Sequence, residues 1–223
     1  MTLRFLRLAP VLLTLLAAFF SAQTAAAQTA PAKQGPEVIG DVVGLTPAVH
    51  GSMSGRLEIG SSVHQGEKIV TGPSGVIELR FLDNTHLMLG SKSSVTLDSF
   101  VYAGNGKAKS VVLQFAKGAF RFATGDSAKS AYKIHAPQAS IGVRGTKFQV
   151  DSRTPTSAIT LYEGKTFICP PRRPIRYCKL VKPGETALVG EDRIIRIVPA
   201  AGSPTEHCTG TPNSKICDTF GGK

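Results

Sequence analysis

Helical periodicity is missing from this 223-residue chain once its first residues are set aside. No apolar pattern with a period of 3.6 residues persists for three turns between helix start and stop signals. Instead, short alternations are separated by glycine, proline and serine, as where Ile77, Leu79 and Phe81 alternate with Glu78 and Arg80. Alternation with period two is typical of a strand with one buried and one solvated face. Many such segments at 8–12-residue spacing predict an all-β fold.

Local signatures of catalysis are also missing. Gly164-Lys165-Thr166 ends like a phosphate-binding loop, but Ile159 stands where that loop needs its first glycine. Met53 occupies the place between Gly51 and Gly55 where a nucleophile elbow carries serine. The histidines show no metal-ligand spacing: His50, His64, His86, His135 and His207. We therefore expect no enzyme activity, no metal site and no cofactor.

A long apolar run occurs only at the N-terminus, where residues 1–27 have the pattern of a signal peptide. Arg4 and Arg7 precede an apolar stretch from Leu8 to Phe20. Small residues at 25–27 then predict cleavage before Gln28. An uncleaved anchor is the alternative, but the run is shorter than the roughly 20 residues that span a membrane. We expect a periplasmic or secreted protein with no membrane-spanning helix after cleavage.

Acidic residues are scarce, with 15 against 26 lysines and arginines. Two of the basic residues and none of the acidic ones lie in 1–27, so the remainder carries a net charge of +9 (24 − 15). Such a balance favours attraction to anionic lipid, lipopolysaccharide or wall polymer, unless it serves solubility alone. Scattered lysines without an aromatic-basic RNA motif argue against nucleic acid as a partner.

Only four cysteines are present, all late in the chain. Their even number in an exported protein predicts disulfides, with three connectivities open. Cys169–Cys178 and Cys208–Cys217 are the simplest pairs, since each spans nine positions. A zinc site is the rival interpretation, but Cys-x-x-Cys is lacking and His207 alone lies close in sequence.

Composition divides the rest of the chain into three parts. Residues 28–36 are small, polar and proline-bearing, as in a flexible leader. Residues 37–198 carry the strand patterns, which predict a compact multi-stranded β-sandwich or a short β-solenoid with glycine and proline turns. Residues 199–223 are rich in proline, glycine, serine and threonine and contain Cys208 and Cys217, which predicts a loosely ordered tail.

Two patterned blocks within 40–190 carry a family resemblance. In the first, Gly66-Glu67 and Ile69 lead to Thr71-Gly72, and an alternating strand then ends at Asp83-Asn84-Thr85. In the second, Arg144-Gly145-Thr146 precedes Phe148 and Val150. Glu163-Gly164 and Pro183-Gly184-Glu185 follow as turns.

These motifs resemble the FecR-type domain of the iron-dicitrate sensor family. The motif residues are Gly66, Thr71, Gly72, Asp83, Arg144, Gly145, Thr146, Glu163, Gly164, Gly184 and Glu185. The glutamate at 67 and the Asn-Thr turn depart from the commonest family forms. A scaffold role is favoured for Arg144, whose side chain could bind strand carbonyls or a carboxylate such as that of Glu163.

The resemblance implies a non-catalytic periplasmic module. Well-known members read the state of an outer-membrane iron transporter and control a sigma factor through a cytoplasmic N-terminal segment. No such segment precedes the apolar run here, so we expect no direct control of a sigma factor. The resemblance instead implies a binding or sensor module for an envelope protein, such as an outer-membrane transporter, or for an anionic envelope polymer. A carbohydrate- or wall-binding structural protein held by basic charge is the alternative.

The loop between Cys169 and Cys178 is the predicted partner-binding site. Its prolines would stiffen it, which lowers the cost of ordering on binding. Arginine forks suit carboxylates and phosphates. The candidate residues are Arg172, Arg173, Arg176 and Tyr177. A solvated loop without a partner is the alternative.

Overall fold

The structure is a computed structural model that describes residues 35–103 and 105–201. Two short 3₁₀ helices, η1 (Lys129–Ala131) and η2 (Ile175–Tyr177), lie among fifteen strands in these residues. The strands are β1 (Val38–Leu45), β2 (Val49–Gly51), β3 (Gly55–Arg56), β4 (Ser62–His64), β5 (Lys68–Thr71), β6 (Ile77–Phe81), β7 (His86–Leu89), β8 (Ser94–Tyr102), β9 (Ala108–Ala123), β10 (Tyr132–Ala136), β11 (Ala139–Ser152), β12 (Ser157–Cys169), β13 (Lys179–Val181), β14 (Glu185–Val189) and β15 (Ile195–Pro199). The predicted all-β class is confirmed.

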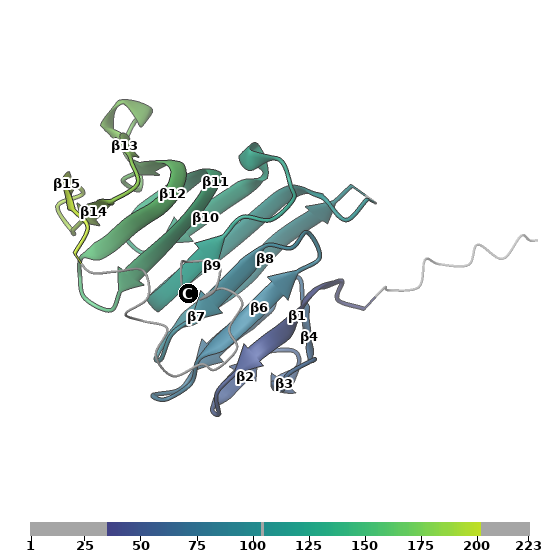
Figure 1. Cartoon of the computed structure of the whole chain (residues 1–223). Helices are drawn as coiled ribbons and strands as arrows, with labels where there is room; N and C mark the ends of the chain where they lie inside the picture. The colour runs from purple at the N-terminus through teal and green to yellow at the C-terminus, as the bar shows by residue number, and fades with distance from the viewer. Residues whose placement is uncertain (1–34, 104, 202–223) are drawn as a thin grey trace, which may run out of the picture. The chain divides into compact units, whose positions relative to one another are not determined.

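Hydrogen bonding joins the strands into one open mixed sheet (Figure 1). Its main path runs β15-β14-β12-β11-β10-β9-β7-β6-β1-β4. Strand β9 holds the sheet together, because its first half pairs with β8 and β10 and its second half with β7 and β11. The β9–β10 pair is parallel, whereas β11 pairs with both β10 and β12 in the antiparallel sense.

One hydrophobic core extends from β1 to β15. The alternation read at Ile77, Leu79 and Phe81 places all three side chains in it. Phe122 and Phe148 are fully buried in it, with ring centroids 5.4 Å apart. Burial of such a side chain stabilises the fold by about 1.5–3 kcal/mol. The core therefore depends on strands from both ends of the described chain.

The predicted tight turns are present where glycine or asparagine allows a left-handed backbone. Asn84 has φ +60° between β6 and β7. Gly184 has φ +82° between β13 and β14. Asparagine tolerates this region because its short side chain can bond locally, and glycine because it has no Cβ.

The predicted signal peptide, most of the leader 28–36 and nearly all of the tail 199–223 lie outside the described residues, as does the Cys208–Cys217 pair. Within residues 35–103 and 105–201, no helix is long and apolar enough to cross a membrane.

Candidate binding surface beside the disulfide loop

The first group of motif residues builds a turn between β4 and β5. Gly66 has φ +79°, and its N–H donates to the carbonyl of Leu97. The Thr71 hydroxyl donates to the carbonyl of Gly90 at 2.6 Å and accepts from the N–H of Ser93 at 2.8 Å. These contacts connect β5 to the segment between β7 and β8, so this motif has a structural role.

The Glu67 carboxylate is fully buried beside that turn. It accepts backbone N–H groups from Ser54 at 2.8 Å, His64 at 3.0 Å and Met53 at 3.3 Å. Burial by itself raises the pKa of Glu67, but these N–H groups favour the charged form and outweigh it, so the pKa lies below the ordinary value. Glu67, which departs from the common family form, is thus charged, and its carboxylate oxygens are hydrogen-bonded.

Asp83 anchors a buried hydrogen-bond network under the turn between β6 and β7. Its Oδ2 accepts the hydroxyl of Tyr132 at 2.7 Å and that of Ser127 at 2.6 Å, and its Oδ1 accepts the N–H of Thr85. Burial and the neighbouring Asp83 raise the pKa of Tyr132 to about 12, so its phenol stays protonated and donates. The network joins β6, β7 and β10.

The Arg-Gly-Thr and Glu-Gly motifs meet across β11 and β12 at a bulge. Gly145 and Gly164 have φ +64° and +83°, and a Cβ at Gly164 would lie only 2.0 Å from the carbonyl oxygen of Gly145. Register shifts occur between Arg144 and Lys147. Thr146 is buried, and its N–H donates to the hydroxyl of Thr124 at 3.1 Å. The two glycines therefore permit a close approach of two backbones.

Arg144 does not contact Glu163, which the sequence suggested, beside strand carbonyls, as one candidate partner. Instead, the Nζ of Lys147 forms an ion pair with the Glu163 carboxylate, with an N–O distance of 2.8 Å. The bulge at Gly145 is the cause, because it brings Lys147 opposite Glu163 in the β11–β12 register. Arg144 is exposed, and its guanidinium carbon lies 5.9 Å from the centroid of the Phe167 ring.

Gly184 and Glu185 form the last motif turn. The Gly184 N–H donates to Leu161, and the Glu185 carboxylate accepts the N–H of Lys182 at 2.8 Å. The family motifs thus serve mainly as turns and bulges of the sheet, and the candidate binding residues lie elsewhere.

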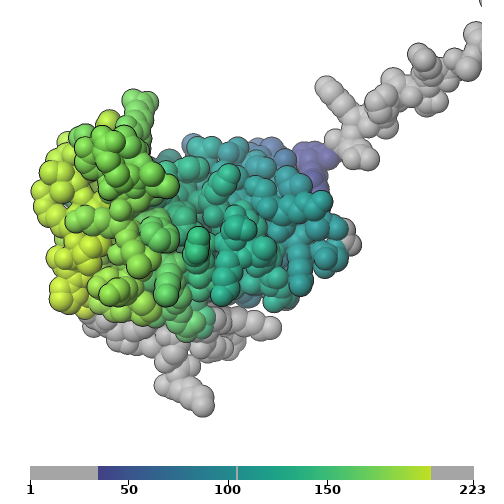
Figure 2. Space-filling model, turned by 90° about the horizontal axis from the view of Figure 1, so that it is seen from above, coloured from purple at the N-terminus to yellow at the C-terminus, as the bar shows by residue number. Residues whose placement is uncertain are grey.

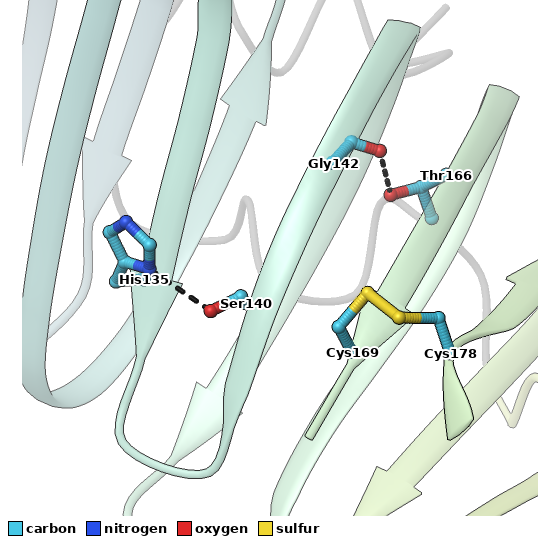
Figure 3. Close-up of a disulfide and its surroundings, with 6 residues drawn as sticks. All are labelled: His135, Ser140, Gly142, Thr166, Cys169 and Cys178. Carbon is cyan, nitrogen blue, oxygen red and sulfur yellow. Dashed lines mark hydrogen bonds between the residues drawn. A yellow bond between two sulfur atoms is a disulfide. The ribbon is translucent and has the colours of Figure 1, made fainter. Parts of the chain in front are cut away.

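Cys169 and Cys178 are bonded, as expected, and close the loop between β12 and β13 (Figure 3). Ser140 of β11 lies opposite Cys169, and further along the same two strands the Gly142 carbonyl accepts the hydroxyl of Thr166 at 2.9 Å. In Figure 2, atoms in the colour of this part of the chain form a protruding knob. A disulfide of this kind is typical of proteins in oxidising compartments.

The loop brings three of its four candidate residues together. The guanidinium carbons of Arg173 and Arg176 lie 5.5 and 5.1 Å from the ring centroid of Tyr177. Arg172 instead lines a separate surface pocket together with Glu191 and Arg193. Stacking on an aromatic face attracts a guanidinium by about 0.5–1 kcal/mol at an exposed site. Arg173 and Arg176 are therefore partly ordered before any partner arrives.

A groove of about 770 Å³ lies against the same disulfide, with Cys169 and Cys178 in its lining. Val143, Phe167 and Ile175 supply its apolar part, and Lys129, Lys133 and Arg144 supply its cations. The sequence patterns did not single out this groove. One signal was available, because Phe167 stands on the outward phase of β12, where a polar residue is usual.

The sheet, its turns and the disulfide loop define an all-β module, and a comparison with family models matches part of it. Residues 67–166 match the family model described as FecR protein. Over these residues, the match confirms the resemblance to the FecR family that the motifs indicated. A comparison with curated proteins found no match.

Two solved structures resemble the fold. Both are crystal structures, at 2.50 and 1.65 Å resolution, of a protein from Parabacteroides distasonis that is provisionally described as an anti-sigma factor. The TM-scores are 0.49 and 0.47, each at 14% identity and with 59% of either chain covered. The chain thus spans 59% of the length of these solved chains, and a likeness this distant has no bearing on function.

Proposed function

We propose that this protein is an exported FecR-domain sensor that recognises an envelope protein through the Cys169–Cys178 loop. The observation that carries the proposal is the stacking of Arg173 and Arg176 on Tyr177 within a covalently closed loop. The loop contains no acidic residue, so its positive charge is not neutralised locally. It offers two oriented guanidinium groups to carboxylates on a partner.

Covalent closure supports a binding role for energetic reasons. A flexible loop loses conformational freedom on binding, at about 0.5–1.5 kcal/mol per side chain that becomes fixed. The disulfide and the tyrosine restrict the arginines beforehand. The resemblance to the FecR family supports a protein as the partner, with an outer-membrane transporter as one candidate, and supports action by binding without catalysis. The disulfide supports a periplasmic or secreted location.

Affinity capture from detergent-solubilised envelope tests this function. The exported protein serves as bait, in parallel with a variant in which Arg172, Arg173 and Arg176 are alanine. A variant with Lys68, Lys107 and Lys109 changed to alanine is the control, because it loses the same charge elsewhere. We expect a discrete membrane protein that survives a high-salt wash with the wild type and the control, and that is lost with the arginine variant.

Two results would contradict the proposal. If both triple variants retain the captured protein equally, the loop is not the site. If only heterogeneous wall polymer or lipopolysaccharide is recovered and salt releases it, electrostatic attachment to the envelope replaces partner recognition.

A further inference from the structure

Exposed apolar side chains gather at one end of the sheet. Phe167 and Leu180 face each other in the β12–β13 register, with 42% and 39% of their surfaces exposed. Ile175 stands on η2 with 86% of its surface exposed. Single exposed apolar residues are ordinary, but a group of them beside a groove marks a binding surface.

The floor of the groove is deep because one of its residues, Gly142, has no side chain. Lys133, Gly142 and Phe167 lie opposite one another across β10, β11 and β12. Gly142 leaves a gap between the other two side chains, because it has none of its own. A Cβ at Gly142 would meet only the carbonyl oxygen of Phe167 at 3.7 Å and its Cβ at 3.9 Å, which are ordinary contacts.

Three cations surround this apolar floor. Lys129, Lys133 and Arg144 are exposed and line the groove. The Lys129 chain extends along Gly145, since its Nζ would lie 3.3 Å from a Cβ there. No carboxylate lines the groove, and none in the described part of the chain forms an ion pair with these three cations. A ligand with a concentrated negative charge and an apolar portion would complement both features.

Backbone pairing distinguishes a lipid from a peptide in this groove. Extended peptides bind mainly by adding main-chain hydrogen bonds to a free strand edge. Here β10 pairs with β9 and β11, β11 pairs with β10 and β12, and β12 at Phe167 pairs with β11 and β13, so none of the three strands of the floor has a free edge. The Gly142 carbonyl is also engaged by the Thr166 hydroxyl. The groove can therefore bind a ligand through side-chain charge and apolar contact, and not through main-chain hydrogen bonds.

We propose that this groove binds a single phosphate-bearing lipid. The apolar chain lies over Gly142 against Phe167 and Ile175, and the phosphate lies among Lys129, Lys133 and Arg144. The site differs from the arginine–tyrosine cluster that we assign to a protein partner. Ile175 and the disulfide border both, so a lipid in the groove also touches the partner-binding loop.

Calorimetric titration of the exported protein with dodecyl phosphate, below its micelle-forming concentration, tests the site. We expect saturable binding of one molecule per chain. Inorganic phosphate and dodecyl maltoside should each bind at least about tenfold more weakly, because each has one of the two features that the groove complements. A titration that does not saturate, or equal binding of all three probes, would overturn the proposal.

Variants locate the binding within the molecule. Gly142→Leu fills the groove where a side chain meets only ordinary contacts, so the variant should fold and should lose at least about tenfold in affinity. Lys133→Ala should weaken binding, whereas Lys68→Ala, an equal loss of charge on β5, should not. Native circular dichroism of Gly142→Leu together with wild-type affinity would exclude the groove.

Competition with a peptide tests whether the groove prefers a protein segment to a lipid. A peptide of alternating glutamate and phenylalanine that displaces dodecyl phosphate at lower concentration would reassign the groove to a protein partner. These titrations use a purified protein and small probes, so their result is independent of the envelope capture. Alanine at Arg172, Arg173 and Arg176 should abolish the capture and leave the titration unchanged.

Discussion

Gly164 and Gly184 have nearly the same backbone angle, with φ +83° and +82°, but different surroundings. A Cβ at Gly184 meets nothing within 4 Å, whereas at Gly164 it would collide with the Gly145 carbonyl at 2.0 Å. Gly184→Ala should therefore lower the free energy of unfolding by only about 1–2 kcal/mol, the cost of a left-handed alanine. Gly164→Ala should cost about 3 kcal/mol or more, because overpacking adds to that strain.

Urea unfolding of both variants measures this difference. The shared angle makes Gly184→Ala a matched control for backbone strain, so the excess at Gly164 reports the close approach of β11 and β12. Equal losses in the two variants would mean that the bulge can open to admit a methyl group.

Glu67 makes stability depend on pH with a definite sign. Its pKa in the folded protein lies below 4.5, because three backbone N–H groups overcome the effect of burial. A lowered pKa means that its stabilising contribution is complete above pH 4.5 and is lost as the pH falls through the folded-state pKa. Glu67→Gln should thus cost about 1–3 kcal/mol at pH 7, through unpaired buried N–H groups, and progressively less as the pH falls through the folded-state pKa of Glu67.

Urea unfolding of wild type and Glu67→Gln at a series of pH values from 7 downward tests this linkage. A difference between the two proteins that does not shrink before acid unfolds the wild type would show that the charge on Glu67 is not what stabilises the turn.

The conformation of a single residue was predictable from the sequence where it depends only on the local backbone. Asn84 and Gly184 were assigned to turns because their left-handed conformations follow from local chemistry. Glu163, one of the partners that the sequence suggested for Arg144, lies elsewhere, because a bulge shifts the strand register and a shift of one residue changes which side chains face each other. Nothing local in the sequence shows that Gly145 permits a bulge and not a simple bend.

At the scale of elements, we expect the disulfide to restrict the loop between β12 and β13 while the sheet forms without it. Changing Cys169 and Cys178 to serine should lower the free energy of unfolding by about 2–3 kcal/mol, the chain-entropy estimate for a small loop. The far-UV circular dichroism should persist, because Cys169 is the last residue of β12 and Cys178 precedes β13, both outside the main core. Trypsin should then cleave faster after Arg172 and Arg176.

Limited proteolysis followed by mass spectrometry measures that cleavage. The serine variants are preferable to a reductant, which would also act on any bond between Cys208 and Cys217. Cleavage at the wild-type rate would show that the prolines and the stacking on Tyr177 suffice to order the loop, and that the disulfide adds little to its stiffness.

The groove could not be inferred from the sequence, although its parts were visible. Lys133 and Gly142 face each other in one hairpin, but Phe167 is 25 residues further along the chain and comes beside Gly142 only through the register of β11 and β12. Register depends on long-range pairing, which local alternation does not specify. The Cys169–Cys178 loop, in contrast, was predictable because its ends are close in sequence and chemically marked.

For the whole molecule, alternation predicted the fold class but not the order of the strands. The pairing of β9 with four different strands arises from its 16-residue length, and only the tertiary structure reveals it. The same connectivity means that the matched family segment, residues 67–166, does not contain the complete core. Ile39, Val63 and Val189 belong to that core and lie outside the segment.

A chain shortened to residues 67–166 should therefore fail to fold. It loses β1, which pairs with β6 and β4, and β14, which pairs with β12, so buried faces of β6 and β12 become exposed. Each large side chain uncovered in this way forfeits about 1.5–3 kcal/mol, and a few such losses exceed the usual 5–15 kcal/mol stability of a domain. Urea unfolding followed by far-UV circular dichroism should show one cooperative transition for the exported protein and none for the fragment. If the fragment unfolds cooperatively at the same urea midpoint as the exported protein, residues 67–166 form a stable domain by themselves and the outer strands add no stability.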